Sequence, residues 1–144
     1  MILPDVNVLL YAFRDHVPDH TAYKAWLDTT VESPEPFAIA DIVLSGFIRI
    51  VTNRRIFDPP DTVHDALEVV SAIRERNNAI VVRPGPRQWE IFEDLLERTG
   101  ATGNLVPDAY LAALAIETGS ELITTDLDFS RFPGLRWRHP LRAA

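Results

Sequence analysis

Short apolar runs alternate with longer stretches of helical spacing along the whole chain. Runs rich in β-branched residues predict strands, and apolar side chains that recur at intervals of three and four residues predict helices that face a core. The predicted strands are 1–4, 37–39, 79–82, 121–125 and 135–138. The predicted helices are 6–14, 21–31, 42–51, 61–73, 88–98 and 107–116. This alternation indicates an α/β sandwich with a mainly parallel sheet flanked by helices.

Residues at the predicted helix ends support this division. Asp41 stands where an N-cap would begin the third helix, Pro107 suits a first helical turn, and Gly119 is placed to end that last helix. The breaks rich in proline and glycine lie at 33–36, 58–61, 83–86 and 99–103. Because none of them is long enough to be a linker, we predict one domain over residues 1–144.

The composition excludes several classes of protein. Hydrophobic residues make up 47% of the chain, which is enough for a core, but no apolar run approaches the roughly 18 residues of a membrane span. The first residues carry no basic region and no long apolar stretch, so no signal peptide is predicted. Since the chain has no cysteine, disulfides and thiolate metal sites are excluded. The sequence is typical of a soluble cytoplasmic protein without membrane contact.

The net charge of -7 argues against binding of nucleic acid through a broad basic surface. It is compatible with a nuclease, because carboxylates that hold a cation add negative charge. The arginines are also unevenly spread, with Arg49, Arg54 and Arg55 in one stretch and four more within 131–142. Either group could meet phosphates, and each is equally well explained as solvated or as a surface for a protein partner.

Aspartates gather where two predicted strands end. Asp5 follows the first strand, and Asp126 follows a late strand, with Asp128 close behind. Asp108 opens the buried helix that precedes that late strand. If the two strands are neighbours, these side chains converge at the carboxyl edge of the sheet, where such folds bind ligands. Close carboxylates repel one another, and Mg²⁺ or Mn²⁺ removes that conflict. The pattern therefore predicts a metal site that activates water to hydrolyse a phosphodiester.

Each aspartate also has an ordinary structural explanation. Asp5 could cap the following helix, and Asp108 could be a first-turn acid favoured by the helix dipole. Asp126 and Asp128 could form an acidic turn. Their combination favours the metal site, but it also describes other acid-cluster α/β proteins, such as phosphatases and receiver domains.

Two polar neighbours are candidates for positioning these acids. Asn7 is expected to hydrogen-bond to Asp5, or to make a local bond in the first helical turn. Thr125 is expected to orient Asp126 or to bind phosphate. Thr124 could do the same, but strand propensity is the preferred explanation for that residue.

Five segments together resemble VapC toxins of the PIN-domain family. They are LPDVNVLLYA at 3–12, FIRIVTNR at 47–54, GNLVPDAYLAALA at 103–115, ELITTDLDF at 121–129 and LRWRHPL at 135–141. The resemblance covers essentially the whole chain, in the right order. It implies a PIN-like three-layer fold and a ribonuclease that acts as the toxin of a type II toxin–antitoxin pair. It also implies cleavage of structured RNA such as tRNA or rRNA, a homodimer, and a VapB-type antitoxin whose tail fills the active-site groove.

The resemblance also assigns roles to residues. By position, the catalytic and metal-binding acids are Asp5, Asp108 and Asp126, with Asp128 as a further ligand for Mg²⁺ or Mn²⁺. Separately, the clustering of arginines makes Arg49, Arg54 and Arg136 the residues expected to contact RNA or the antitoxin.

One position departs from the family pattern. Many PIN domains have a glutamate in the helix before the Phe-Ile-Arg segment, where this chain has Gly46. Asp41 lies five residues earlier, and at about 100° per residue it faces another direction and is a poor substitute. The missing acid supports a second hypothesis, a catalytically weak PIN domain that acts by binding RNA or antitoxin. Two features argue against the other acid-cluster proteins. A phosphatase of the aspartate-nucleophile type requires an aspartate where this chain has Asn7. A receiver domain requires a lysine near the late strand, but the only lysine of the chain is Lys24.

Overall fold

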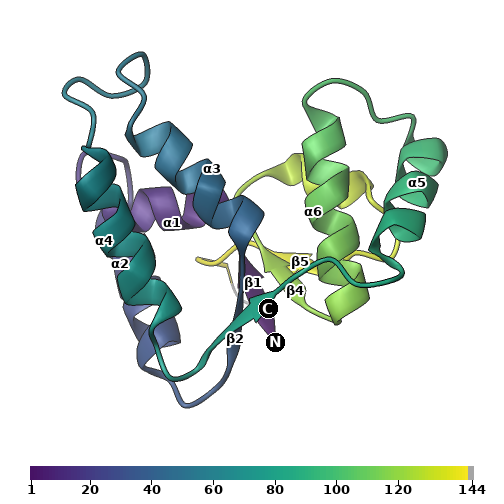
Figure 1. Ribbon diagram of the computed structural model, residues 1–144, viewed down its shortest axis with the longest axis horizontal. Helices are drawn as coiled ribbons and strands as arrows, with labels where there is room; N and C mark the ends of the chain where they lie inside the picture. The colour runs from purple at the N-terminus through teal and green to yellow at the C-terminus, as the bar shows by residue number, and fades with distance from the viewer. Residues whose placement is uncertain (143–144) are drawn as a thin grey trace.

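The computed structural model describes residues 1–142, which form a central sheet with helices on both of its faces (Figure 1). The strands are β1 (Ile2–Pro4), β2 (Phe37–Ala40), β3 (Ala79–Val82), β4 (Glu121–Ile123) and β5 (Trp137–Arg138). The helices are α1 (Val6–Phe13), α2 (His20–Glu32), α3 (Asp41–Val51), α4 (Val63–Arg74), α5 (Gln88–Thr99) and α6 (Leu105–Thr118), and a short 3₁₀ segment, η1 (Leu127–Arg131), follows β4. Every predicted strand and helix is confirmed, with ends that move by one or two residues.

The sheet has five strands in the order β3-β2-β1-β4-β5, and all neighbouring strands are parallel. β1 pairs with β4 from Ile2 opposite Glu121 to Pro4 opposite Ile123, so strands from the two ends of the chain finish at one level. The Asp5 N–H extends this pairing by donating to the Ile123 carbonyl over 2.9 Å. The predicted parallel sheet is confirmed, and the two strands that lead to the aspartates are neighbours.

Helices from the two halves of the chain cover opposite faces of the sheet. Figure 1 shows α1 to α4 on one side and α5 with α6 on the other. Within these layers α1 packs on α2 and α3, α3 packs on α4, and α5 packs on α6. This arrangement is the three-layer sandwich that the sequence predicts. Within residues 1–142, no helix combines the length and apolar character that crossing a membrane requires.

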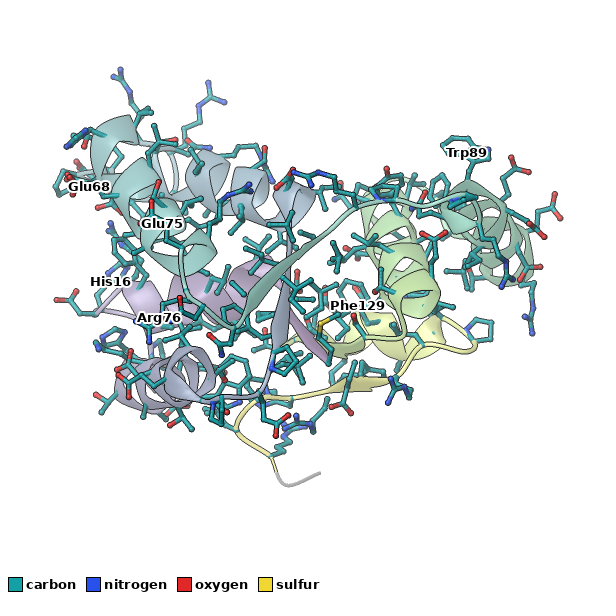
Figure 2. All side chains as sticks on the ribbon, turned by 60° about the horizontal axis from the view of Figure 1, so that its bottom comes forward. His16, Glu68, Glu75, Arg76, Trp89 and Phe129 are labelled. Carbon is teal, nitrogen blue, oxygen red and sulfur yellow. The ribbon has the colours of Figure 1, made fainter. Side chains whose placement is uncertain are left out.

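The core follows the apolar pattern of the sequence. Phe47 and Phe129 are among the largest fully buried side chains. Helix α6 buries small residues, including Ala112 and Ala113 at 0% exposure, which explains why its sequence is apolar almost all round. In Figure 2, Phe129 lies inside the fold, whereas Trp89 projects from the start of α5, where 60% of the residue is exposed.

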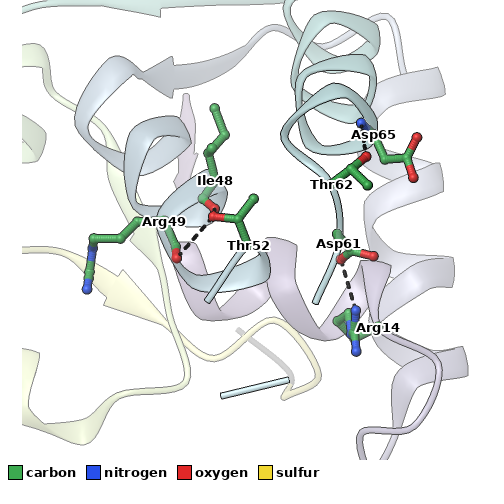
Figure 3. Close-up of polar contacts among 7 residues, drawn as sticks. All are labelled: Arg14, Ile48, Arg49, Thr52, Asp61, Thr62 and Asp65. Atoms are coloured by element: carbon green, nitrogen blue, oxygen red, sulfur yellow. Dashed lines mark hydrogen bonds and ion pairs between the residues drawn. The ribbon is translucent and has the colours of Figure 1, made fainter. Parts of the chain in front are cut away.

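The connection between α3 and α4 is fastened to α1 (Figure 3). Arg14 Nη1 of the segment after α1 lies 2.9 Å from Asp61 Oδ2, and the same guanidinium lies 4.0 Å from the ring centroid of Phe57. Thr62 is the N-cap of α4, and its hydroxyl accepts the Asp65 N–H at 3.1 Å. These contacts hold the segment between α3 and α4 in place. Of the basic stretch, Arg49 lies in α3, whereas Arg54 and Arg55 lie in this segment.

Asp41 does not have its predicted capping role. Ala40 is the N-cap of α3, and Asp41 is the first residue of the helix, without a side-chain capping bond. Its carboxylate lies 2.6 Å from Arg74 Nη1 and 3.6 Å from Arg83 Nη2. The prediction was wrong because ion pairs with two other segments occupy the same oxygens. Gly119, with φ of 68°, ends α6 as predicted.

Candidate active site

Asp5 stands directly after β1 and begins α1. Its Oδ1 accepts the Val6 N–H at 2.7 Å, the contact of an N-cap residue, and its Oδ2 accepts the Thr124 hydroxyl at 2.7 Å. Only 8% of the residue is exposed. The capping explanation is therefore confirmed, and it leaves the Asp5 carboxylate fixed at the carboxyl edge of the sheet.

Asp126 reaches the same edge from β4. Its Oδ1 accepts the Asp128 N–H at 2.8 Å, which caps η1 and fixes the turn after the strand. Asp128 is exposed, and its Oδ1 lies 3.3 Å from Arg131 Nη2. The acidic turn that the sequence left open is thus present, and its geometry places two carboxylates side by side.

Asp108 approaches from the opposite layer, in the first turn of α6. Carboxylate oxygens of Asp108, Asp126 and Asp128 all lie within 4.8 Å of one another. Asp5 is not a member of this group, and both of its oxygens already accept hydrogen bonds. Of the four acids predicted to bind metal, three therefore come together, and the fourth lies beside them.

Three of these four acids line one cavity of about 360 Å³ at the carboxyl edge of the sheet. Asp5, Asp108 and Asp126 form its acidic side. Helix α3 forms another side and contributes Gly46 and Arg49. An open, acidic cavity at this position is where parallel α/β sheets bind their ligands.

The acids perturb one another electrostatically. Burial, followed by repulsion from Asp126, Asp5 and Asp128, raises the pKa of Asp108 to about 6, and only Arg131 acts in the opposite direction. Burial also raises the pKa of Asp5, against the effect of its hydrogen bonds from Thr124 and Val6. Ionising all of these groups together is costly without a positive charge between them.

The donor set fits a hard divalent cation. Carboxylate oxygens are the preferred protein ligands of Mg²⁺ and Mn²⁺, and Mg²⁺ commonly keeps several waters and uses one or two carboxylates. Asp108, Asp126 and Asp128 supply at least that many carboxylates, and the adjoining cavity leaves room for water and substrate.

Thr124 is a positioning residue, although the sequence favoured strand propensity as the explanation for it. It is completely buried, donates to Asp5 Oδ2, and accepts the Asp126 N–H at 3.1 Å, so it links the two strand-end acids. Thr125 was expected to orient Asp126, but Thr124 is the threonine whose hydroxyl contacts both acids, and binding of phosphate by Thr125 stays a prediction. Side chains alternate along a strand, so a threonine two residues before Asp126 was the available signal.

Asn7 also lacks its predicted contact. Among the hydrogen bonds of residues 1–142, none joins Asn7 to Asp5, whose oxygens accept from Val6 and Thr124 instead. Asn7 does line the cavity.

The three predicted contact arginines lie in different places. Arg49 is exposed and lines the cavity, whereas Arg54 is exposed beyond the end of α3. Arg136 donates from Nη2 to the Gly119 carbonyl at 2.7 Å. Gly119 lies eleven residues after Asp108 along α6, or roughly 16 Å at 1.5 Å per residue. Arg136 is therefore at the opposite edge of the sheet from the acids, and its contact with RNA or the antitoxin stays a prediction.

Gly46 is confirmed as a position without an acid in the cavity wall. A Cβ atom added there would lie 3.0 Å from Val6 Cγ2, so a larger residue would require Val6 to shift. The close approach of α3 to α1 explains why a glycine suits this position.

Comparison with known proteins places the chain among close relatives. The model of the PIN domain matches residues 2–135. Ribonuclease VapC43 of Mycobacterium tuberculosis is 43% identical over 141 residues, which are 98% of this chain and 96% of the relative. Ribonuclease VapC25 of the same organism is 37% identical over 140 residues, which are 97% of this chain and 99% of the relative.

Solved structures have the same fold at lower identity. VapBC2 from Rickettsia felis, bound to a DNA fragment from its promoter, has a TM-score of 0.70 and 22% identity, with 96% of this chain and 98% of that chain covered. VapC20 of Mycobacterium tuberculosis, described as a toxin that cleaves the sarcin–ricin loop, has a TM-score of 0.67 and 21% identity, with 94% and 99% covered.

Proposed function

The chain belongs to the VapC ribonucleases of the PIN-domain family, and we propose that it is a metal-dependent endoribonuclease, the toxin of a type II toxin–antitoxin pair. One observation carries the proposal: oxygens of Asp108, Asp126 and Asp128 lie within 4.8 Å of one another at the carboxyl edge of a parallel sheet. Their mutual repulsion disfavours this arrangement unless a cation joins them, so the geometry suits a metal-assisted reaction.

In the proposed site, Asp108, Asp126 and Asp128 hold Mg²⁺ or Mn²⁺. When bound, the ion lowers the pKa of a water and stabilises negative charge on a phosphate. Asp5 adds negative charge next to these ligands, and Thr124 keeps Asp5 and Asp126 in fixed relative positions. No nucleophile is needed from the protein, since water attacks the phosphodiester.

The proposed substrate is an RNA of the tRNA or rRNA class, and the proposed partners are a VapB-type antitoxin and a second copy of the chain. Relatives named as VapC ribonucleases and structural neighbours that are VapBC complexes support these assignments. An apolar groove of about 770 Å³ next to the cavity, lined by Ile42, Trp89 and Phe92 among others, supports a protein partner. Such a toxin would act in the cytoplasm, where its RNA is found.

A second candidate function is binding without efficient cleavage. Gly46 favours it, because the wall of α3 supplies no carboxylate to the cavity and the donor set is correspondingly small. The antitoxin and RNA surfaces would then carry the function.

The deciding experiment is cleavage of total cellular RNA by the purified protein, with Mg²⁺, with Mn²⁺ and with chelator. We expect discrete fragments that require metal, and a loss of at least about a hundredfold in Asp126→Asn, because that change removes a charged ligand yet retains an oxygen that can cap η1. Asp94→Asn is the matched control, since Asp94 is exposed on α5 and pairs with Arg98. We expect it to cleave like the unchanged protein.

Metal binding can be followed separately from activity. Added Mg²⁺ or Mn²⁺ should raise the unfolding temperature of the unchanged protein and of Asp94→Asn, and should affect Asp126→Asn much less. Cleavage that persists in chelator and in Asp126→Asn would rule out the metal-dependent reaction. Metal-induced stabilisation without any cleavage would favour the binding function.

A further inference from the structure

The cavity has walls of opposite charge. Its acidic side is formed by Asp5, Asp108 and Asp126, which come from β1, α6 and the end of β4. Across from them α3 contributes Arg49, the one basic side chain among the residues that line the cavity within residues 1–142. A phosphodiester is an anion, so the carboxylate side repels it and the guanidinium side attracts it.

Arg49 is available for an external anion. Arg14, Arg74 and Arg131 each form an ion pair with an aspartate of the fold. Within residues 1–142, no ion pair or side-chain hydrogen bond of Arg49 is found. In Figure 3 its side chain extends from α3 on the side away from the Arg14–Asp61 pair. The guanidinium is therefore exposed at the cavity without an internal partner.

Gly46 keeps that guanidinium free. It precedes Arg49 by three residues on α3, and both positions line the cavity. Residues three apart on a helix are neighbours, so an acid at position 46 would pair with Arg49 and neutralise it. Val6 Cγ2, which would lie 3.0 Å from a Cβ at position 46, leaves little room for a side chain there.

We propose that Arg49 binds a phosphate of the RNA strand in the cavity, on the wall opposite the carboxylates. This assignment rests on the proposed function and adds the residue that places the substrate. A guanidinium presents parallel N–H donors to two phosphate oxygens, and so it fixes orientation as well as charge. Arg131 is paired with Asp128, so Arg49 is the positive group at the cavity that remains available to a phosphate.

The test is binding of a labelled single-stranded RNA oligonucleotide in chelator, where cleavage is blocked, measured by fluorescence anisotropy over a series of salt concentrations. We expect Arg49→Gln to weaken binding about tenfold or more, as for loss of a charged hydrogen bond. The slope of log K against log salt should also fall by about 0.7, the value for one phosphate contact with a single strand. Arg49→Lys should keep the slope and recover part of the affinity, because it retains charge but not the paired donors.

Arg87→Gln is the matched control, because Arg87 is also exposed but lies at the start of α5 and does not line the cavity. It should bind RNA like the unchanged protein. Equal affinity and slope in Arg49→Gln and the unchanged protein would overturn the assignment of Arg49. That result would not contradict the proposed cleavage of RNA. Equal losses in Arg49→Gln and Arg87→Gln would also overturn it, because they would reflect net charge alone. Absence of both RNA binding and metal-dependent cleavage in the unchanged protein would overturn the proposed function itself.

Discussion

The two edges of the sheet use polar side chains in opposite ways. At the edge where the strands begin, Asn78 Nδ2 donates to the carbonyls of Thr30, Ser33 and Glu35 at 3.1, 2.8 and 2.8 Å. Arg136 similarly donates to a backbone carbonyl after α6. These polar groups have their hydrogen-bond partners within the fold, so they stabilise it and do not need a ligand as a partner.

At the edge where the strands end, the polar groups are not balanced. Asp108, Asp126 and Asp128 approach one another, and the pKa of Asp108 rises to about 6. This arrangement lowers stability, and a cation would relieve it. The comparison suggests that a residue's function follows from whether its charge is compensated within the fold, rather than from its residue type.

The largest effect is expected at the residue that joins the acids. Thr124→Val keeps the shape of the buried side chain but removes the donor to Asp5 Oδ2 and the acceptor for the Asp126 N–H. We expect a loss of about 3 kcal/mol in the free energy of unfolding, because two buried polar groups lose a partner. RNA cleavage should fall as well, since both acids lose their anchor.

Urea denaturation and cleavage rates per folded protein would measure both effects. Thr124→Ser, which keeps the hydroxyl, is the matched control and should retain most of the cleavage. Equal cleavage by the valine and serine variants would show that the hydroxyl does not position the acids.

A smaller effect, confined to stability, is expected at the other edge. Asn78→Ala removes the amide that three backbone carbonyls share, and we expect a loss of about 2 kcal/mol in the free energy of unfolding. The rate of RNA cleavage per folded molecule should be unchanged, because Asn78 precedes β3 and the acids follow β1 and β4. Urea denaturation beside cleavage assays at low temperature measures the two quantities, and a reduced rate in fully folded Asn78→Ala would break the separation between the edges.

The fold could be predicted because its signals are local. The apolar runs and helical spacing gave every strand and helix, and Gly119 ended α6 in the left-handed conformation that glycine permits. The ends of the strands and helices were predicted less accurately. For example, β4 ends at Ile123, whereas the predicted strand ends at residue 125.

The acids of the site were predictable, but their contacts were not. Asp5, Asp108 and Asp126 follow from their places after strands and at a helix start. The alternation of side chains along a strand favours Thr124 over Thr125, but it decides between them only if the extended chain continues past the end of β4 at Ile123, which the sequence alone did not establish. The place of Arg136 could not be predicted either, because the position of an arginine along the chain does not reveal which edge of the sheet it occupies.

The smallest effect is a pH dependence of stability in the metal-free protein. The folded-state pKa of Asp108 is about 6 and its ordinary value is 3.8, so the unfolded chain releases this proton at lower pH than the folded protein does. The contribution of Asp108 to the free energy of unfolding is fully present at pH values below its ordinary pKa of 3.8, and it is lost as the pH rises through about 6. Asp108→Asn removes this titration. The unfolding temperature of the variant minus that of the unchanged protein should therefore increase from about pH 4 to about pH 7 in chelator.

Added Mg²⁺ or Mn²⁺ at neutral pH should reduce this difference, since the ion would relieve the same repulsion in the unchanged protein. Asp94→Asn, on the exposed face of α5, controls for the loss of one negative charge and should follow the unchanged protein across the range. If the curves of Asp108→Asn and the unchanged protein run parallel in chelator, the repulsion among the acids is too weak to distinguish the two edges of the sheet by stability.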